Sequence, residues 1–381
     1  MYCASASVDK MVDCMMREPL GPRKGLVVFV AAKNKPDLKT LVAKLNEKGI
    51  LFCGGVFPGV IEGGQSFETG VVACVVPMGG APAVVENLGS ASRNSLCASL
   101  NPDIKKEKQT ALVLLDGLSS GIDRFLADLF HRFGHTVNYI GGGCGSLALQ
   151  HEPCVFSNEG VFQDAAVVSF IPGSCGMGVR HGWHKLMGPV VATHTAGNRI
   201  FTLNWEDAYT GYRAVIREDS GEDLTRENFY RLAMQYPFGI IKEGCEIVVR
   251  DAIMLGEKNE LICCGEVPEN AVLSILKGDR KSLPAAARQA AWDAVWDAVT
   301  SDKRNAFQKD RRQVLVFDCI SRTLYLGEAF ATELASINDI FCQLDGMNSI
   351  AGSMSFGEIA LSCNGSLEFY NKTTVVGIIH E

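Results

Sequence analysis

The segment Arg180-His181-Gly182-Trp183 places a cation, an imidazole and an aromatic face within four residues. An arginine can hold a carboxylate through two parallel hydrogen bonds, and a tryptophan can line an apolar pocket. On a strand, Arg180 would face one side, and His181 and Trp183 would face the other. The segment is therefore a candidate carboxylate-binding site, although a surface arginine beside a core tryptophan would give the same pattern.

A second group of reactive side chains lies near the C-terminus, where Cys319 precedes Arg322 by three residues. A nearby arginine or a helix N-terminus lowers the pKa of a thiol and can make it a nucleophile. Such a nucleophile needs a base, for which His181 and His194 are the candidates. A thiol that is packed in the core, or that lines a ligand pocket, is the simpler interpretation of Cys319. For His194, the simpler interpretation is a structural role in which the side chain is hydrogen-bonded.

Three further polar residues complete the candidate site. Glu358 lies between two predicted strands, and a buried glutamate must be paired or protonated, with Arg322 as a possible partner. Asn198 and Asn371 lie in predicted turns. We expect Arg180 or Arg322 to hold a ligand carboxylate and Glu358 to accept a hydrogen bond from an amino group. A solvated turn carboxylate is the alternative for Glu358.

Two stretches, residues 54–77 and 141–172, repeat one design: a glycine cluster, a variable loop and an apolar strand closed by proline. Glycine lets backbone approach backbone or ligand closely. The cluster at 141–145 lacks the Gly-Lys-Ser/Thr ending of a phosphate-binding loop. Its alternatives are tight sheet packing and a loop whose N–H groups hold an anionic or zwitterionic ligand, with Gly142 and Cys144 taking part.

Composition excludes several classes of protein. The 381 residues are 47% hydrophobic and 21% charged, which is typical of a globular protein of two or three domains. A net charge of −7 without a long basic run opposes a nucleic-acid partner. No apolar run reaches the roughly eighteen residues of a membrane span, and the N-terminus does not have the pattern of a secretory signal.

The chain has 14 cysteines, many within apolar strands, and no Cys-x-x-Cys pair. Free cysteines of this kind indicate a reduced, cytoplasmic protein. The absence of zinc-type spacing predicts no structural metal site, and we expect no cofactor.

Apolar periodicity predicts more strands than helices. Clear strands are expected at 25–31, 70–76, 110–116 and 314–319, and helices at 37–49, 119–133, 283–300 and 327–337. Tight polar turns between strands predict an α/β (α+β) fold of layered, largely antiparallel or mixed sheets flanked by helices, in two similar sub-domains. A charged link at 217–227 suggests a lead-in at 1–24 and domains at 25–216 and 217–381.

Taken in order, these segments resemble the FIST family, the sensory domain named for F-box and intracellular signal transduction proteins. The resemblance covers roughly residues 25 to 379 and rests on several motifs together: Gly141 to Gly145, Val179 to Trp183, Phe317 to Arg322, Gly352 to Glu358 and Tyr370 to Thr373. It implies that 25–216 and 217–381 are the FIST N-terminal and C-terminal domains. Ser146 stands where the family favours an acidic residue, so ligand preference can differ.

The resemblance implies a cytosolic module that binds small ligands, such as amino acids, and passes the signal to a partner. It supplies no catalytic residues. Because no output domain is recognisable in this sequence, the partner is expected to be a separate protein. We expect a cleft between two parts, lined by Gly142, Cys144, Arg180, His181 and Trp183 on one side and by Cys319, Arg322, Glu358 and Asn371 on the other. A Cys319-dependent amidohydrolase-like enzyme and a protein-interaction scaffold are the alternatives.

Overall fold

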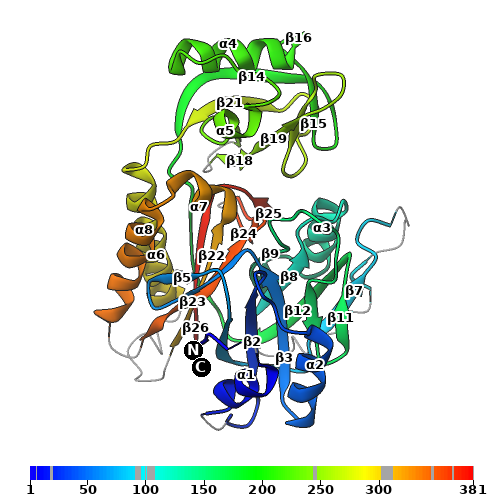
Figure 1. Ribbon diagram of the computed structural model, residues 1–381, viewed down its shortest axis with the longest axis vertical. Coiled ribbons are helices and arrows are strands. Elements are labelled where there is room, and N and C mark those ends of the chain that lie inside the picture. The colour runs from blue at the N-terminus through cyan, green and yellow to red at the C-terminus, as the bar shows by residue number, and fades with distance from the viewer. Residues whose placement is uncertain are drawn as a thin grey trace.

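The computed structural model describes residues 1–5, 7–17, 20–90, 96–98, 100, 108–242, 247–301, 312–344, 347–362 and 364–380. Among these residues, the strands form four sheets with helices packed against them. Three sheets make up a lower body, and the fourth forms a smaller part above it (Figure 1). The predicted α/β class, with mixed and antiparallel sheets, is confirmed.

The first sheet is built around a parallel pair of strands joined by a helix. Helix α2 (Leu38–Glu47) begins at Asp37, whose carboxylate accepts from the Thr40 N–H at 3.1 Å, and its leucines are buried. A second helix, α1 (Val8–Met15), lies beside α2. In sheet order, the strands are β1 (Tyr2–Cys3), β6 (Val71–Pro77), β2 (Lys24–Ala31), β3 (Leu51–Phe57), β10 (Val155–Ser157) and β11 (Gly160–Phe162).

The second sheet has the same plan, and α3 (Ile122–Phe133) with the short η1 (Gly134–Thr136) joins its parallel pair. The apolar stripe of α3 is buried against the sheet, as the helical spacing of its residues predicts. In sheet order, the strands are β25 (Leu367–Tyr370), β24 (Glu358–Leu361), β9 (Val137–Cys144), β8 (Gln109–Asp116), β12 (Ala165–Pro172) and β7 (Ala83–Glu86).

The third sheet repeats the plan once more. Helices α7 (Ile320–Leu326) and α8 (Ala329–Cys342) join its parallel pair, and α6 (Ser282–Ser301) packs against β13 and β26. In sheet order, the strands are β13 (Gly176–Arg180), β26 (Thr374–His380), β22 (Arg312–Cys319), β23 (Met347–Ser355), β4 (Gly59–Glu62) and β5 (Gln65–Phe67).

The sequence repeat therefore extends to a third unit. In each unit a parallel pair is followed by a hairpin and then by a strand antiparallel to the first of the pair: β2, β3 and β6; β8, β9 and β12; β22, β23 and β26. Each hairpin crosses to a neighbouring sheet, so that β4 pairs with β23, β10 with β3 and β24 with β9. This exchange ties the three units into one body.

One glycine recurs at the same place in each unit. It lies on the second parallel strand, opposite a valine: Gly54 opposite Val28, Gly141 opposite Val113, and Gly352 opposite Val316. A Cβ at Gly141 or Gly352 would lie 1.8 Å from the valine carbonyl oxygen, and a Cβ at Gly54 would lie 2.4 Å from it. Close sheet packing therefore accounts for these glycines.

The fourth sheet forms the upper part of the molecule, with α4 (Ala208–Ser220) and α5 (Phe229–Ala233) against it. The predicted division after residue 216 falls within α4. After β21 the chain returns to the lower body (Figure 1). In sheet order, the strands are β18 (Val248–Arg250), β17 (Phe238–Ile240), β21 (Val272–Lys277), β14 (His184–Ala196), β15 (Arg199–Leu203), β20 (Leu261–Cys263) and β19 (Ala252–Leu255), with β16 (Glu206–Asp207) paired to β15.

Candidate functional site

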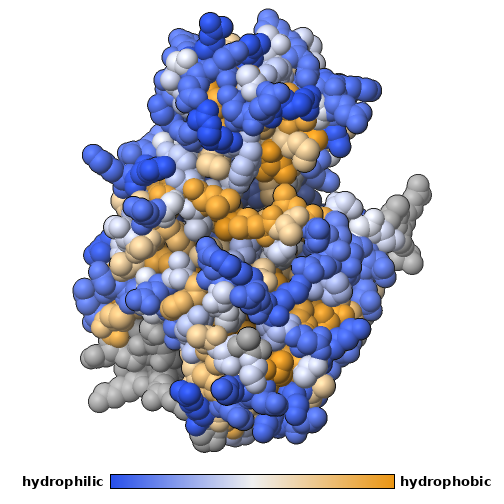
Figure 2. All heavy atoms as spheres, viewed as in Figure 1, coloured by the Kyte–Doolittle hydropathy of each residue, from blue (hydrophilic) through white to orange (hydrophobic). Residues whose placement is uncertain are grey.

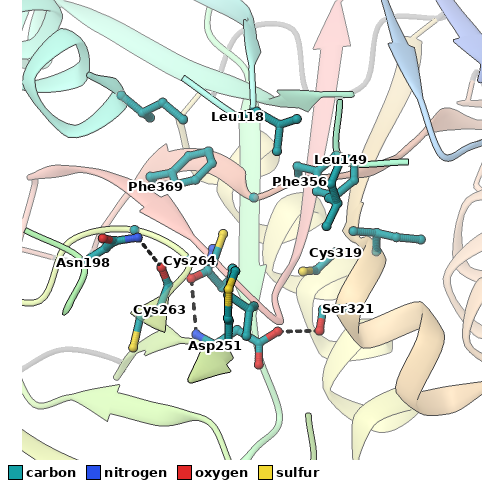
Figure 3. A pocket seen from close by; sticks show the side chains of 18 of the residues that line it. Leu118, Leu149, Asn198, Asp251, Cys263, Cys264, Cys319, Ser321, Phe356 and Phe369 are labelled. Atoms are coloured by element: carbon teal, nitrogen blue, oxygen red, sulfur yellow. Dashed lines mark hydrogen bonds between the residues drawn. The ribbon is translucent and has the colours of Figure 1, made fainter. Parts of the chain in front are cut away.

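A cavity of about 600 Å³ lies where the lower body meets the fourth sheet (Figure 3). Its lower wall includes the turns that follow β8 and β22, the equivalent strands of the second and third units. Ligand sites of α/β sheets characteristically lie at such carboxyl ends of strands. The upper wall comes from the loops of the fourth sheet, and hydrophobic side chains gather on both sides of the junction (Figure 2).

The turn after β8 is shaped by a buried aspartate. Asp116 accepts from the Leu118 N–H at 3.0 Å with one carboxylate oxygen and from the Asp164 N–H at 2.9 Å with the other. These two bonds fold the chain so that Leu118 and Ser119 line the cavity. The first turn of α3 continues this wall with Ile122 and Asp123. The turn and the helix start together supply the lining residues Gly117, Leu118, Ser119, Ser120, Ile122 and Asp123.

The turn after β22 supplies a thiol and a hydroxyl. Cys319 is the residue just before α7, and Ser321 lies in the first turn of that helix. The Ser321 hydroxyl donates to Asp251 from the fourth sheet and accepts from Lys372 Nζ at 2.6 Å. Tyr230 Oη lies 3.2 Å from the same hydroxyl. This hydrogen-bonded group joins the upper and lower walls.

Two asparagines fix the loops at the edge of the cavity. The Asn198 side chain, in the turn between β14 and β15, donates to the Cys263 carbonyl of β20 at 2.9 Å. The Asn371 side chain donates to the Tyr370 carbonyl at 2.9 Å and accepts from the Asp251 N–H at 3.5 Å. Both residues line the cavity, so they add polar groups to its wall and also hold the loops that form it.

Three cysteines are among the residues that line the cavity, and each thiol has a raised pKa. Burial, and after it the negative charge of Asp251, raises the pKa of Cys264 to about 12. The same two causes raise the pKa of Cys263 well above its usual range. Burial, followed by Glu358, raises the pKa of Cys319. The surroundings of these thiols therefore oppose negative charge.

Of the ten residues predicted for a binding site, Asn198, Cys319 and Asn371 line this cavity. Arg180 is not among the lining residues, and its Nε donates to the Asp293 carboxylate of α6 at 2.6 Å. Its side chain is 40% exposed. The predicted carboxylate contact of Arg180 thus faces α6 and not the cavity.

Arg322 is fully buried and holds Glu333 through two hydrogen bonds of 2.8 and 2.7 Å. Its remaining N–H groups donate to the carbonyls of Leu283, His181 and Lys372. The partner expected from the sequence was Glu358, whereas the structure places Glu333 on the guanidinium. Because its five N–H donors face these protein acceptors, Arg322 holds the surrounding segments together behind the cavity.

His181 and Trp183 also belong to this hydrogen-bonded group around Arg322. Burial, and after it the charge of Arg322, lowers the pKa of His181 to about 3, so the imidazole is neutral. Its Nδ1 accepts from the Trp183 N–H at 2.9 Å. The indole N–H of Trp183 donates to the Lys372 carbonyl at 3.1 Å. Residues from both predicted sides of the site, such as His181 and Arg322, therefore do come together, but they do so inside the protein core.

The remaining predicted residues lie within or between the sheets. Gly142 pairs with Glu358 across β9 and β24, and a Cβ at Gly142 would lie 2.8 Å from the Phe317 ring. Cys144 is fully buried, and burial followed by Cys154 raises its pKa. Glu358 accepts from the Ser355 hydroxyl at 2.9 Å, while its Oε2 has no hydrogen-bond partner.

The geometry does not favour the thiol-nucleophile alternative. His194 is stacked on Phe201 and lies 3.3 Å from Glu269 at the surface, outside the residues that line the cavity. His181 uses its Nδ1 on backbone, and Cys319 has a raised pKa. A catalytic thiol would need a lowered pKa and an adjacent base.

The sequence interpretation missed most of the cavity wall, including Leu118, Asp123, Asp251 and Phe356. One signal was available, because the strand at 110–116 and the helix after it were both predicted. The rule that ligands bind at the carboxyl ends of such strands would have drawn attention to residues 117–123. Asp251 carries no local signal of this kind.

These features define a mixed α/β protein with a ligand-sized cavity at its strand ends. Family comparison matches residues 25–206 to the FIST N domain and residues 208–361 to the FIST C domain. The chain therefore belongs to the FIST family, whose domains are associated with sensory proteins of signal transduction. No curated protein matches the sequence.

Among the residues that the structure describes, no three His, Cys, Asp or Glu side chains are grouped in a way that could hold a metal ion. Within the same residues, no helix has both the length and the apolar character to cross a membrane.

Proposed function

We propose that this protein is a cytoplasmic sensory protein that binds a small molecule, related to the amino acids, in the cavity between the lower body and the fourth sheet. The observation that carries the proposal is the cavity itself: its volume of about 600 Å³ suits a small metabolite, and it lies at the strand ends where α/β proteins place ligands. Membership in a family associated with sensory proteins supports it.

The position of the cavity also suggests how binding would be signalled. Its walls come from two parts of the molecule, and the buried group around Ser321, Asp251 and Lys372 connects them. A ligand that contacts both walls would stabilise one arrangement of these parts, and a separate signalling protein would respond to that arrangement. Neither a nucleic acid nor a membrane is part of this proposal.

A thermal-shift screen tests the proposal. Purified protein is melted with amino acids, their amine and acid relatives, and nucleotides. A ligand at one hundred times its Kd stabilises the native state by about 2.7 kcal/mol. We expect a dose-dependent rise in Tm with one class of small molecule and none with nucleotides.

Two matched variants locate the site. Leu324→Trp places a bulky ring at the cavity wall, where Leu324 is 43% exposed. Val299→Trp makes a comparable change on α6, at a residue that is 38% exposed and lies outside the cavity. The ligand-induced shift should disappear in the first variant and persist in the second. The proposal fails if no compound of the screen raises Tm, or if both variants respond alike.

A further inference from the structure

The charged residues that line the cavity have one sign. Among the described residues of the wall they are Asp123, Asp251 and Glu266, and none is an arginine, lysine or histidine. The Glu266 N–H donates to Asp123 at 3.3 Å, which places these two acidic residues side by side. A ligand carboxylate in the cavity would therefore meet no cationic side chain and would face negative charge.

Two cations behind the wall, Arg250 and Lys372, are already engaged. Arg250 donates to the carbonyls of Glu266, Phe369 and Val249, and its Nη2 lies 4.0 Å from Asp123. Lys372 donates to Ser321 and to the Met234 carbonyl and lies 3.3 Å from Asp251. Each of these cations is thus paired with one acidic residue of the wall, and the exposed Glu266 adds a further negative charge.

A second, independent observation is that two buried oxygens of the wall have no hydrogen-bond partner. One is Oδ1 of Asp251, a residue that is 1% exposed, and the other is the hydroxyl of Ser119, a residue that is 9% exposed. They belong to opposite walls, since Asp251 lies in the fourth sheet and Ser119 in the turn after β8. Buried polar atoms are nearly always bonded. The Asp251 oxygen can only accept, so it points to a ligand that donates, whereas the Ser119 hydroxyl can donate as well as accept.

Many of the other lining residues are apolar. The side chains come from both walls and from the strand turns of the body: Leu118, Ile122, Leu149, Ile253, Phe356 and Phe369. Figure 3 shows Leu118, Leu149, Phe356 and Phe369 gathered on the side of the cavity away from Asp251. The cavity therefore combines apolar surface with acidic side chains.

We propose that the cavity selects an apolar amine: a small molecule with an ammonium group, an apolar body and no free carboxylate. An amino acid whose carboxyl group has been removed, or blocked as an ester or amide, has this chemistry. The inference rests on the proposed function, because it names the class of ligand for the same cavity. The ammonium group would lie toward the acidic residues, and the apolar body toward the two phenylalanines.

Matched compounds that differ only in their head group test the inference. The first series is 2-phenylethylamine, 2-phenylethanol, phenylalanine and 3-phenylpropionate, and the second is the corresponding set built on the leucine side chain. Binding to the full chain is measured by titration calorimetry. In at least one series, we expect the amine to bind at least about tenfold more tightly than the alcohol and the acid. A tenfold difference in Kd corresponds to the free energy of one charge-assisted hydrogen bond.

Two charge-removing variants then assign the selectivity. Glu266→Gln should weaken amine binding about three- to tenfold and leave alcohol binding unchanged. Glu269→Gln, on the same loop but paired with His194 outside the cavity, should change neither. Raising the salt concentration should weaken amine binding only, because salt screens exposed charges.

The possible outcomes distinguish a failure of this inference from a failure of the proposed function. If a carboxylate or the free amino acid binds as tightly as the amine, the inference is overturned, whereas the proposed sensory function stands. Equal binding of amine and alcohol overturns it as well. Persistence of amine binding in Leu324→Trp would place the site elsewhere and overturn both. If no compound of either series binds, the inference fails, and the broader thermal-shift screen decides whether the proposed function fails too.

Discussion

The Nζ atom of Lys372 lies 2.6 Å from the hydroxyl oxygen of Ser321, and both side chains are buried. The ammonium group also donates to the Met234 carbonyl at 2.9 Å and lies 3.3 Å from the Asp251 carboxylate. Because Asp251 and Met234 belong to the upper part and Ser321 and Lys372 to the lower body, one buried cation fastens the two parts together behind the cavity.

Replacing this cation should be costly. Lys372→Met removes the partner of Asp251 and leaves a carboxylate buried, which typically costs about 3–5 kcal/mol of unfolding free energy. Lys277→Met is the control, because Lys277 pairs with Asp219 at the surface, is 45% exposed and should lose at most about 1 kcal/mol. Urea unfolding of both variants measures the difference. Similar stabilities would show that the buried pair does not hold the parts together.

The buried carboxyl group of Glu358, whose Oε2 has no hydrogen-bond partner, predicts a pH dependence of stability. Burial is the main cause that raises its pKa, so the folded protein keeps this proton at a pH where the unfolded chain loses it. The contribution to stability is complete below the ordinary pKa of 4.5 and decreases as pH rises above it. Glu358→Gln cannot ionise and should escape this loss.

The stability difference between Glu358→Gln and the unmodified protein should therefore grow in favour of the variant from about pH 5 to 8, by at most about 1.4 kcal/mol for each pH unit. Chemical unfolding at several pH values measures it. Glu328→Gln, at an exposed position, is the control and should show no such trend. A constant difference for Glu358→Gln would contradict the prediction.

The thiols allow a direct test of the enzyme alternative. Cys319 is 3% exposed and has a raised pKa, whereas Cys342 is exposed. Because the thiolate is the reactive form, iodoacetamide at pH 7 should modify Cys342 well before Cys319. Mass spectrometry of the labelled peptides over time measures both rates in one sample. Faster modification of Cys319 would instead support an activated thiolate.

The recurring glycine of the three units should not tolerate alanine. At Gly352 the added Cβ would lie 1.8 Å from the Val316 carbonyl oxygen, so Gly352→Ala must push two paired strands apart. We expect a loss at the upper end of the roughly 1–3 kcal/mol that over-packing costs. Gly211→Ala is the matched control, since Gly211 lies in α4 with open space around it, and should gain up to about 1 kcal/mol. Equal effects would show that the sheet can relax at Gly352.

Much of the secondary structure was predictable because it depends on local periodicity. The apolar run at 110–116 is β8, and the alanine-rich stretch at 283–300 is α6. The repeated glycine clusters also indicated repeated units, because tight strand packing needs glycine whatever the rest of the chain does. The third unit was less visible, since Gly352 stands alone where the others have a cluster.

The binding residues depended on the tertiary structure. A guanidinium binds whichever carboxylate the fold brings to it, and for Arg180 that carboxylate is Asp293, 113 residues along the chain. Arg322 is satisfied by Glu333, so neither arginine is left for a ligand in the cavity. The sequence by itself determined the elements and the motifs that mark the family, because these follow from local spacing. Only the fold decided that Asp123, Asp251 and Phe356 meet around one cavity, because contacts between distant loops leave no periodic signal.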